Sequence, residues 1–265
     1  MIAVDGIILI VSCQKHQTTR LRENNLEENY ENWKVIKVIG DLFLDCDYKL
    51  EGNLMTIKCE DSYLHLLKKM VLSLKYIYEI FDIKEGILRC GDDLIFNENN
   101  LVTFLKSSKK NKINDDEYID IDYMGVHIDI GSSYDPNKPI NCDFFVNYYN
   151  CHPEDFDNPQ HNLKGVDIAK YKMRPYVKNY IAGPLIYFSN KSCKILINHM
   201  SNIDYNIYHY DDKTEGYPYH LEDTAISYIL LLNNIKLISA NYWYCDIGVD
   251  PQMYIALHTN NYKYT

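Results

Sequence analysis

The chain has 265 residues, which is enough for one large domain or two small ones with a proper hydrophobic core. Its apolar and charged fractions, 46% and 24%, are ordinary for a soluble globular protein. The formal net charge of −10 argues against nucleic-acid binding through a general basic surface. No segment reaches the roughly 18 apolar residues that span a bilayer. We therefore expect a soluble protein without a transmembrane anchor in this chain and without a nucleic-acid partner.

The start of the chain has an apolar core, but it carries Asp5 and lacks both a basic segment and a small-residue cleavage site. We expect a first strand there and not a signal peptide. Lys, Asn, Ile and Tyr are frequent (25 Tyr), as in an AT-rich genome such as that of a large DNA virus or a protist. The expected location is cytoplasmic, in the host cytoplasm or virus factory if the protein is viral.

The eight cysteines are spread along the chain and form no CxxC pair, so the spacing of a zinc site is absent. Mostly free thiols are expected, although the even count leaves disulfides open.

Strand and helix patterns alternate in the first part of the chain. Residues 6–12 are a continuous apolar run, which is typical of a strand covered on both faces. Residues 14–32 have helical composition, and residues 33–39 return to strand character, which gives the order of a βαβ unit. Residues 53–58 form a further short strand.

Residues 63–81 carry apolar side chains at helical spacing, with Asp61 or Ser62 as the N-cap. A strand at residues 87–88 follows, and a second amphipathic helix is expected at 99–106.

The second part of the chain begins with polar segments. Residues 107–122 read as a solvated loop, and residues 135–162, rich in Pro, Asn and Asp, predict long loops. Residues 180–189 indicate a strand interrupted by Gly183-Pro184, and residues 190–200 a helix.

A further helix is expected over residues 224–232, opened by residues 220–223, and a short strand over 253–257 precedes His258. No repeat or linker divides the chain. The patterns predict one α/β domain over residues 1–265, with a Rossmann-like, mainly parallel central sheet flanked by helices.

Gly91-Asp92-Asp93 lies between two largely apolar segments, residues 86–90 and 94–96. The pattern predicts a buried strand that ends at two acidic residues, followed directly by a second strand. Paired carboxylates at the end of a buried strand are costly unless a positive group, usually a divalent cation, compensates them. Gly-Asp-Asp is also good turn chemistry by itself, so a simple turn is the alternative. The acidic charge and short length disfavour the acidic turn of a template-dependent polymerase.

Three separated features could converge in such a fold: Asp92 with Asp93, Glu222 with Asp223, and His258. Ligands of open α/β sheets collect beyond the carboxyl ends of the strands. Carboxylate and imidazole ligands suit a divalent ion bound to a diphosphate, and the other acidic pair suits a base for an acceptor hydroxyl. The alternatives are acids that serve a helix dipole and a histidine on the surface.

The order and spacing of these features resemble the β-1,3-galactosyltransferases and β-1,3-N-acetylglucosaminyltransferases, the family that includes the fringe enzymes. The matching segments cover most of the chain in the family's order: residues 7–12 with Arg20, residues 60–69, 89–96, 180–183 and 221–224, and His258. Residues 60–69 are similar to the family's Asp-Ser-Tyr…Lys segment, residues 89–96 to Lys-x-Asp-Asp-Asp, and residues 221–224 to Glu-Asp-Val.

The resemblance implies a GT-A fold and an inverting glycosyltransferase that uses a UDP-sugar, with UDP-GlcNAc or UDP-galactose favoured, and Mn²⁺ or Mg²⁺. By position, Asp93 and His258 become metal ligands, and Asp92 helps to hold the ribose or donor sugar. Asp223 becomes the general base that deprotonates a hydroxyl of a glycan or glycoprotein acceptor. A single displacement then inverts the anomeric carbon.

Further residues take weaker nucleotide-sugar-binding roles by position: Arg20, Asp61, Lys69 and Arg89. Lys69 also fits a solvated helix face. Glu222 and Gly183 are expected near the donor and acceptor. Residues 1–106 would bind the nucleotide sugar and residues 107–265 the acceptor, although the loops over 135–178 match nothing in the family.

Two departures qualify the resemblance. Gly91 stands where the family usually has its first Asp, and Arg89 replaces a Lys with the same charge. The membrane anchor and disulfides of animal members are not evident here. The missing Asp favours an alternative, a non-catalytic carbohydrate- or nucleotide-binding protein that kept the fold, and a different nucleotide-dependent transferase is a third hypothesis. Aromatic residues could stack on acceptor sugars or simply pack, namely Tyr148, Tyr149, Tyr217, Tyr219 and Trp243.

Overall fold

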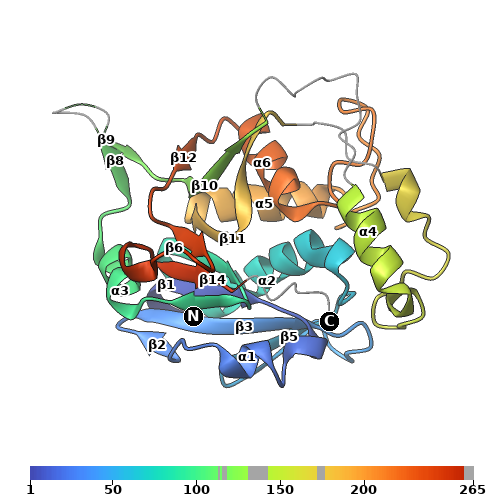
Figure 1. Ribbon diagram of the computed structural model, residues 1–265, viewed down its shortest axis with the longest axis horizontal. Helices are drawn as coiled ribbons and strands as arrows, with labels where there is room; N and C mark the ends of the chain where they lie inside the picture. The colour runs from blue at the N-terminus through green and yellow to red at the C-terminus, as the bar shows by residue number, and fades with distance from the viewer. Residues whose placement is uncertain (113, 115–117, 131–142, 172–176, 260–265) are drawn as a thin grey trace.

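The computed structural model describes residues 1–112, 114, 118–130, 143–171 and 177–259. Its largest feature is a nine-stranded mixed sheet among these residues, in the order β12-β10-β11-β6-β1-β3-β5-β4 with β2 paired to β3 (Figure 1). The strands are β1 (Ile2–Val11), β2 (Asn29–Tyr30), β3 (Trp33–Gly40), β4 (Tyr48–Glu51), β5 (Leu54–Ile57), β6 (Phe81–Gly91), β10 (Tyr123–Asp129), β11 (Asn179–Ser189) and β12 (Leu237–Ser239).

The helices of the described residues are α1 (Arg20–Glu23), α2 (Leu66–Ile80), α3 (Glu98–Lys106), α4 (Asp143–Cys151), α5 (Asn190–Asn202) and α6 (Glu222–Leu232). In Figure 1, α2, α5 and α6 lie on one side of the central sheet and α1 on the other. Within the described residues, no helix is both long and apolar enough to cross a membrane.

The centre of the sheet is parallel, because β6, β1, β3 and β5 pair in that order with the same direction. The outer pairings of β4, β10 and β11 with their neighbours are antiparallel, apart from the parallel pair of β10 and β12. This arrangement confirms the predicted α/β class with a mainly parallel central sheet flanked by helices. From β1 the chain runs outward to β3 and β5, and α2 then returns it to β6 on the other side of β1.

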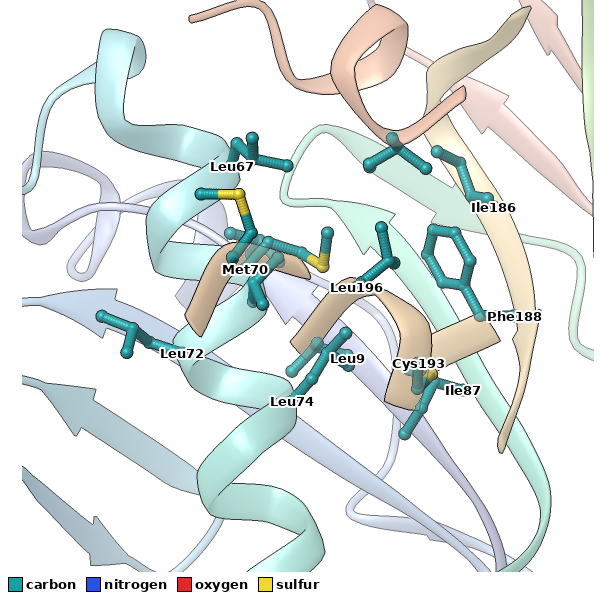
Figure 2. Packing of buried hydrophobic residues seen from close by; sticks show 14 of the residues in the cluster. Leu9, Leu67, Met70, Leu72, Leu74, Ile87, Ile186, Phe188, Cys193 and Leu196 are labelled. Atoms are coloured by element: carbon teal, nitrogen blue, oxygen red, sulfur yellow. The ribbon is translucent and has the colours of Figure 1, made fainter. Parts of the chain in front are cut away.

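The two faces of β1 belong to different clusters of buried side chains. Leu9 faces the cluster formed with α2, α5 and α6, whereas Ile8 and Ile10 face the cluster that contains Trp33 and Leu101. Figure 2 shows Leu67, Met70 and Leu74 of α2 packing with Leu196 and Cys193 of α5 and with Leu9, Ile87 and Phe188 of the sheet. A strand that is buried on both faces explains the continuous apolar run over residues 6–12.

Several predicted elements are confirmed with shifted ends, among them β3, β5, α2, α3, α5 and α6. The predicted cap is present in part, because the Ser62 hydroxyl accepts a hydrogen bond from the backbone N–H of His65 in the 3-10 turn Tyr63–His65 that leads into α2. Seven cysteines are described and all are free, namely Cys13, Cys46, Cys59, Cys90, Cys151, Cys193 and Cys245, and Cys142 lies outside the described residues.

Other expectations were wrong. The helix expected over residues 14–32 is reduced to a 3-10 turn, Gln14–His16, and the four-residue α1, because the segment has too few apolar residues to cover a helical face. The strand over residues 180–189 is not interrupted; instead, its pairing with β10 slips near Gly183. The expected loop over 107–122 contains a hairpin, β8 (Lys110–Lys112) with β9 (Tyr118–Asp120).

The expected loop over residues 135–162 contains the helix α4, and residues 131–142 lie outside the described part. A second sheet was missed: β13 (Tyr244–Asp246), β14 (Ala256–His258) and β7 (Leu94–Phe96) pair in that order. It joins the strand that follows Asp93 to the strand that ends at His258.

Candidate active site

A cavity of about 600 Å³ opens where β1 and β6 end. The connections from these two strands leave in opposite directions along the sheet, so this is the topological switch point at which open α/β sheets bind ligands. The cavity is lined by every site residue predicted from the sequence: Arg20, Asp61, Lys69, Arg89, Asp92, Asp93, Gly183, Glu222, Asp223 and His258.

Asp93 and His258 meet at one end of this site, 3.3 Å apart between Oδ2 and Nε2. The backbone N–H and the hydroxyl of Thr259 both donate to the Asp93 carbonyl, which fixes the end of β14 against the acidic turn. The other ring nitrogen of His258, Nδ1, lies 2.9 Å from Oδ1 of Asp246. Burial opposes the imidazolium, but hydrogen bonds with Asp93 and Asp246 outweigh it and raise the pKa of His258.

This donor set fits a divalent cation. A carboxylate oxygen and an imidazole nitrogen point at each other from two elements, and a carboxylate on the second ring nitrogen is the usual partner of a metal-bound histidine. Among the described residues, no group of three or more His, Cys, Asp and Glu side chains could hold a metal alone. Asp93 and His258 are thus the two residues here that could hold such an ion.

Asp92 belongs to a different cluster. Its Oδ2 accepts a hydrogen bond from the Ser12 hydroxyl at 2.5 Å and lies 2.8 Å from Nδ1 of His16, and its Oδ1 lies 3.4 Å from Arg20. Burial opposes ionisation, yet these partners lower the pKa of Asp92, and the hydrogen bond to Asp92 raises the pKa of His16 to about 9. The sequence analysis missed Ser12 and His16, although their place after a buried strand was the available signal.

Asp61 and Lys69 form a buried ion pair of 2.6 Å. The Lys69 ammonium also donates to the Ser12 carbonyl at 2.7 Å, and Asp61 accepts from the backbone N–H groups of Gln14 and Gly40 at 2.6 and 2.8 Å. Lys69 is 1% exposed, so the alternative of a solvated helix face was wrong. The pair joins the ends of β1 and β3 to α2, and so it shapes one wall of the cavity.

Arg89 turns its guanidinium to the start of α6. One terminal nitrogen donates to Oε2 of Glu222 at 2.6 Å and the other to the Gly183 carbonyl. Burial raises the pKa of Glu222 to about 6 and that of Asp223 to about 6, against the opposing effect of Arg89. Asp223 also accepts the N–H of Thr224 at 2.8 Å, so it serves the helix start as well as lining the cavity.

Gly91 lies close to the carboxylate of Asp93. A Cβ at this position would lie 2.8 Å from Oδ1 of Asp93, closer than real Cβ contacts. With this backbone, an aspartate at residue 91 would therefore push the Asp93 carboxylate away from its present position.

The described part of residues 135–178 contributes a wall that the sequence analysis did not assign. The backbone carbonyl of Gln160 accepts a hydrogen bond from the N–H of Asp61 at 2.9 Å. The side-chain oxygen of Gln160 accepts one from the N–H of Leu42 at 2.8 Å. The cavity is also lined by Tyr148 and Asp155 from this segment. Residues from 1–106 and from 107–265 both line the cavity.

Of the five aromatic residues singled out, only Tyr148 lines this cavity, where its ring stacks on Tyr63 with centroids 5.7 Å apart. Tyr149, Tyr219 and Trp243 are buried and pack in the interior. Tyr217 packs on Tyr171.

No family model matches the sequence, and no curated protein matches it. Among solved structures, the chain is similar to mouse xyloside xylosyltransferase 1 in its apo form, with 9% sequence identity, 98% of each chain covered and a TM-score of 0.40. Similarity at this level assigns neither a family nor an activity to the chain, so a functional proposal has to rest on the residues of the cavity.

Proposed function

We propose that this chain is an inverting, divalent-metal-dependent glycosyltransferase that moves a sugar from a UDP-sugar to a hydroxyl of a glycan or glycoprotein. One observation carries the proposal. A metal-type pair, Asp93 with His258, and a base-type carboxylate, Asp223, line a single cavity at the switch point of the sheet. The family resemblance supports UDP-GlcNAc or UDP-galactose as the donor.

The chain's own cations support a diphosphate at this site. Lys15, His16 and Arg20 line the cavity, and the hydrogen bond to Asp92 raises the pKa of His16 to about 9, so its imidazole is charged at neutral pH. A Mn²⁺ or Mg²⁺ ion held by Asp93 and His258 would neutralise the charge of the leaving diphosphate. By the family resemblance, Asp92 would help to hold the ribose or the donor sugar.

Asp223 would act as the base. With a pKa of about 6, it is ionised at neutral pH and is a stronger proton acceptor than an ordinary aspartate. As the acceptor oxygen bonds to the anomeric carbon, the bond from that carbon to the diphosphate oxygen breaks, and the hydroxyl proton moves to Asp223. Because the nucleophile attacks opposite the leaving group, one displacement inverts the configuration.

A direct test is release of UDP from a panel of UDP-sugars with Mn²⁺ and glycan acceptors, with the anomer of the product assigned by NMR. We expect turnover with an inverted product in the wild type and no turnover in Asp93→Ala or Asp223→Asn, with UDP binding retained in Asp223→Asn. A product that retains the configuration, or nucleotide binding that ignores the metal, would contradict the proposal.

Gly91 favours one second candidate, a non-catalytic carbohydrate- or nucleotide-binding protein, because the family's first acid is missing there. This candidate predicts metal-dependent UDP binding without UDP release towards any acceptor of the panel.

A further inference from the structure

Arg89 was expected to contact the nucleotide or diphosphate, but its position suggests a different role. Its side chain is buried, with the residue 3% exposed, and both terminal nitrogens are used by Glu222 and the Gly183 carbonyl. The remaining nitrogen, Nε, has no hydrogen-bond partner among the described residues. The charge of Arg89 therefore acts on the start of α6.

Arg89, Glu222 and Asp223 carry three charges at the start of α6, and the two acids differ in burial and in their contact with Arg89. Glu222 is 6% exposed and is anchored to Arg89 through Oε2, while its Oε1 has no hydrogen-bond partner in the described part of the chain. Both acids line the cavity, but Asp223 is less buried than Glu222. The buried pair of Arg89 and Glu222 is neutral as a unit, which leaves Asp223 as the net negative charge of the cluster.

We propose that Arg89 and Glu222 are positioning residues that set the proton affinity of Asp223 in opposite directions, Arg89 lowering it and Glu222 raising it. The inference rests on the proposed role of Asp223 as the base. It assigns to Arg89 a task inside the protein in place of a donor contact. It also explains why a second acid, which the reaction does not need, stands directly before the base.

The other ionisable groups near Asp223 do not supply a compensating charge. Burial raises the pKa of Tyr123 on β10 above its ordinary value and that of Tyr244 on β13 to about 12, so both are neutral. Lys69 on α2 is paired with Asp61, and Asp93 at the end of β6 is paired with His258. Arg89 is thus the cation that bears on Asp223, and Glu222, its neighbour in the chain, is the carboxylate coupled to it.

Substitutions should then act with opposite signs. Arg89→Met leaves two carboxylates without their cation, so the proton affinity of Asp223 rises. Glu222→Gln keeps the shape and a hydrogen bond to Arg89 but leaves the guanidinium to act on Asp223 alone, so the affinity falls. The double variant removes a neutral pair and should return Asp223 close to the wild type. A purely structural role would lower stability without this pattern of signs.

The test is a ¹³C-carboxyl NMR titration of protein labelled at aspartate, with the Asp223 signal assigned from the spectrum of Asp223→Asn. We expect the pKa of Asp223 to rise by about 1 unit in Arg89→Met and to fall by about 1 unit in Glu222→Gln, within the usual effect of a charge at close range. Arg89→Lys, which keeps the charge, should lie closer to the wild type than Arg89→Met. The acidic limb of kcat/KM should move in the same order.

Lys109→Met is the matched control. This lysine is also largely buried and paired with an acid, Glu85 at 3.2 Å, but it lies outside the cavity. It should lower the melting temperature and leave the Asp223 titration unchanged. Shifts of the same sign in Arg89→Met and Glu222→Gln, or no shift in either, would overturn the inference. If Arg89→Met does not fold, Glu222→Gln and Arg89→Lys decide.

The titration separates this inference from the proposed function. If the wild type releases UDP from no donor, the proposed function fails, while the Asp223 titration still reports on Arg89 and Glu222. If turnover is observed but the titration lacks the opposite shifts, only the inference fails.

Discussion

Asp223 is a carboxylate whose surroundings favour its neutral form. Burial raises its pKa from an ordinary 3.8 to about 6, so the folded protein binds this proton more tightly than the unfolded chain does. At neutral pH the ionised side chain therefore lowers stability. That cost fades as the pH falls from about 6 towards 3.8, where the proton is bound in both states.

The raised pKa gives a stability prediction for Asp223. Asp223→Asn should raise the melting temperature at pH 7.5 by several degrees, since a shift of about 2 pKa units corresponds to at most about 3 kcal/mol. The gain should be smaller at pH 5 and close to zero below pH 4, and turnover should be lost throughout. Differential scanning calorimetry across this range is the measurement. A variant that is less stable than the wild type at pH 7.5 would contradict the origin given for the raised pKa.

Two glycines give a matched pair of tests. Gly91→Ala should weaken metal-dependent UDP binding about tenfold or more. The new Cβ would lie 2.8 Å from Oδ1 of Asp93 and would displace that carboxylate. In Gly183→Ala the new Cβ would lie 3.9 Å from Glu222 and Asp223, which is an ordinary contact. This variant should leave UDP binding unchanged and narrow the space in which the transferred sugar would lie. Calorimetric titration with UDP and Mn²⁺ distinguishes them. Equal UDP affinities in Gly91→Ala and the wild type would contradict the steric role of Gly91.

At the scale of elements, the segment after β1 is positioned by a buried ion pair and not by a helix of its own. Lys69 on α2 and Asp61 before it hold the Ser12 carbonyl and the Gln14 N–H. Ser12 and His16, which both contact the Asp92 carboxylate, lie in this same segment. The shape of the cavity therefore depends on α2 as well as on the sheet.

Removing this cation should be costly. Lys69→Met should lower the free energy of unfolding by about 3–5 kcal/mol, because it leaves the buried Asp61 carboxylate without its counter-charge. Lys49→Met, which removes an exposed lysine paired with Glu51, should cause no measurable change. Urea unfolding followed by fluorescence compares them. If Lys69→Met were as stable as the wild type, the pair would not anchor the segment after β1.

Sequence periodicity predicted well the elements whose pattern of burial is regular along their length. The continuous apolar run of β1 survives in the structure because the strand is buried on both faces, and the helical spacing of α2 survives because the helix buries one apolar face against the sheet and α5. The helix predicted over residues 14–32 was wrong because the segment has a helical composition but too few apolar residues to form one apolar face. The slip of pairing at Gly183 and the hairpin of β8 and β9 depend on partners far along the chain, which local patterns do not contain.

At the scale of the molecule, the site joins distant parts of the chain. Asp93 and His258 are 165 positions apart, and the small sheet of β7, β14 and β13 brings them together. The position of Asp92 and Asp93 at the end of a strand was predictable from the apolar residues around them. Their partners were not, because nothing local indicates that Asp92 pairs with His16 or that Arg89 turns to Glu222.

In the proposed function, Asp93 and His258 hold a divalent cation, and binding of the donor's nucleotide depends on that cation. Calorimetric titration of UDP into the wild type, with Mn²⁺ or with EDTA, tests it most directly, alongside Asp93→Asn and His258→Gln. We predict UDP binding with Mn²⁺, its loss in EDTA, and at least tenfold weaker binding in both variants. UDP binding of equal strength with and without Mn²⁺, or no UDP binding at all, would contradict this role of Asp93 and His258.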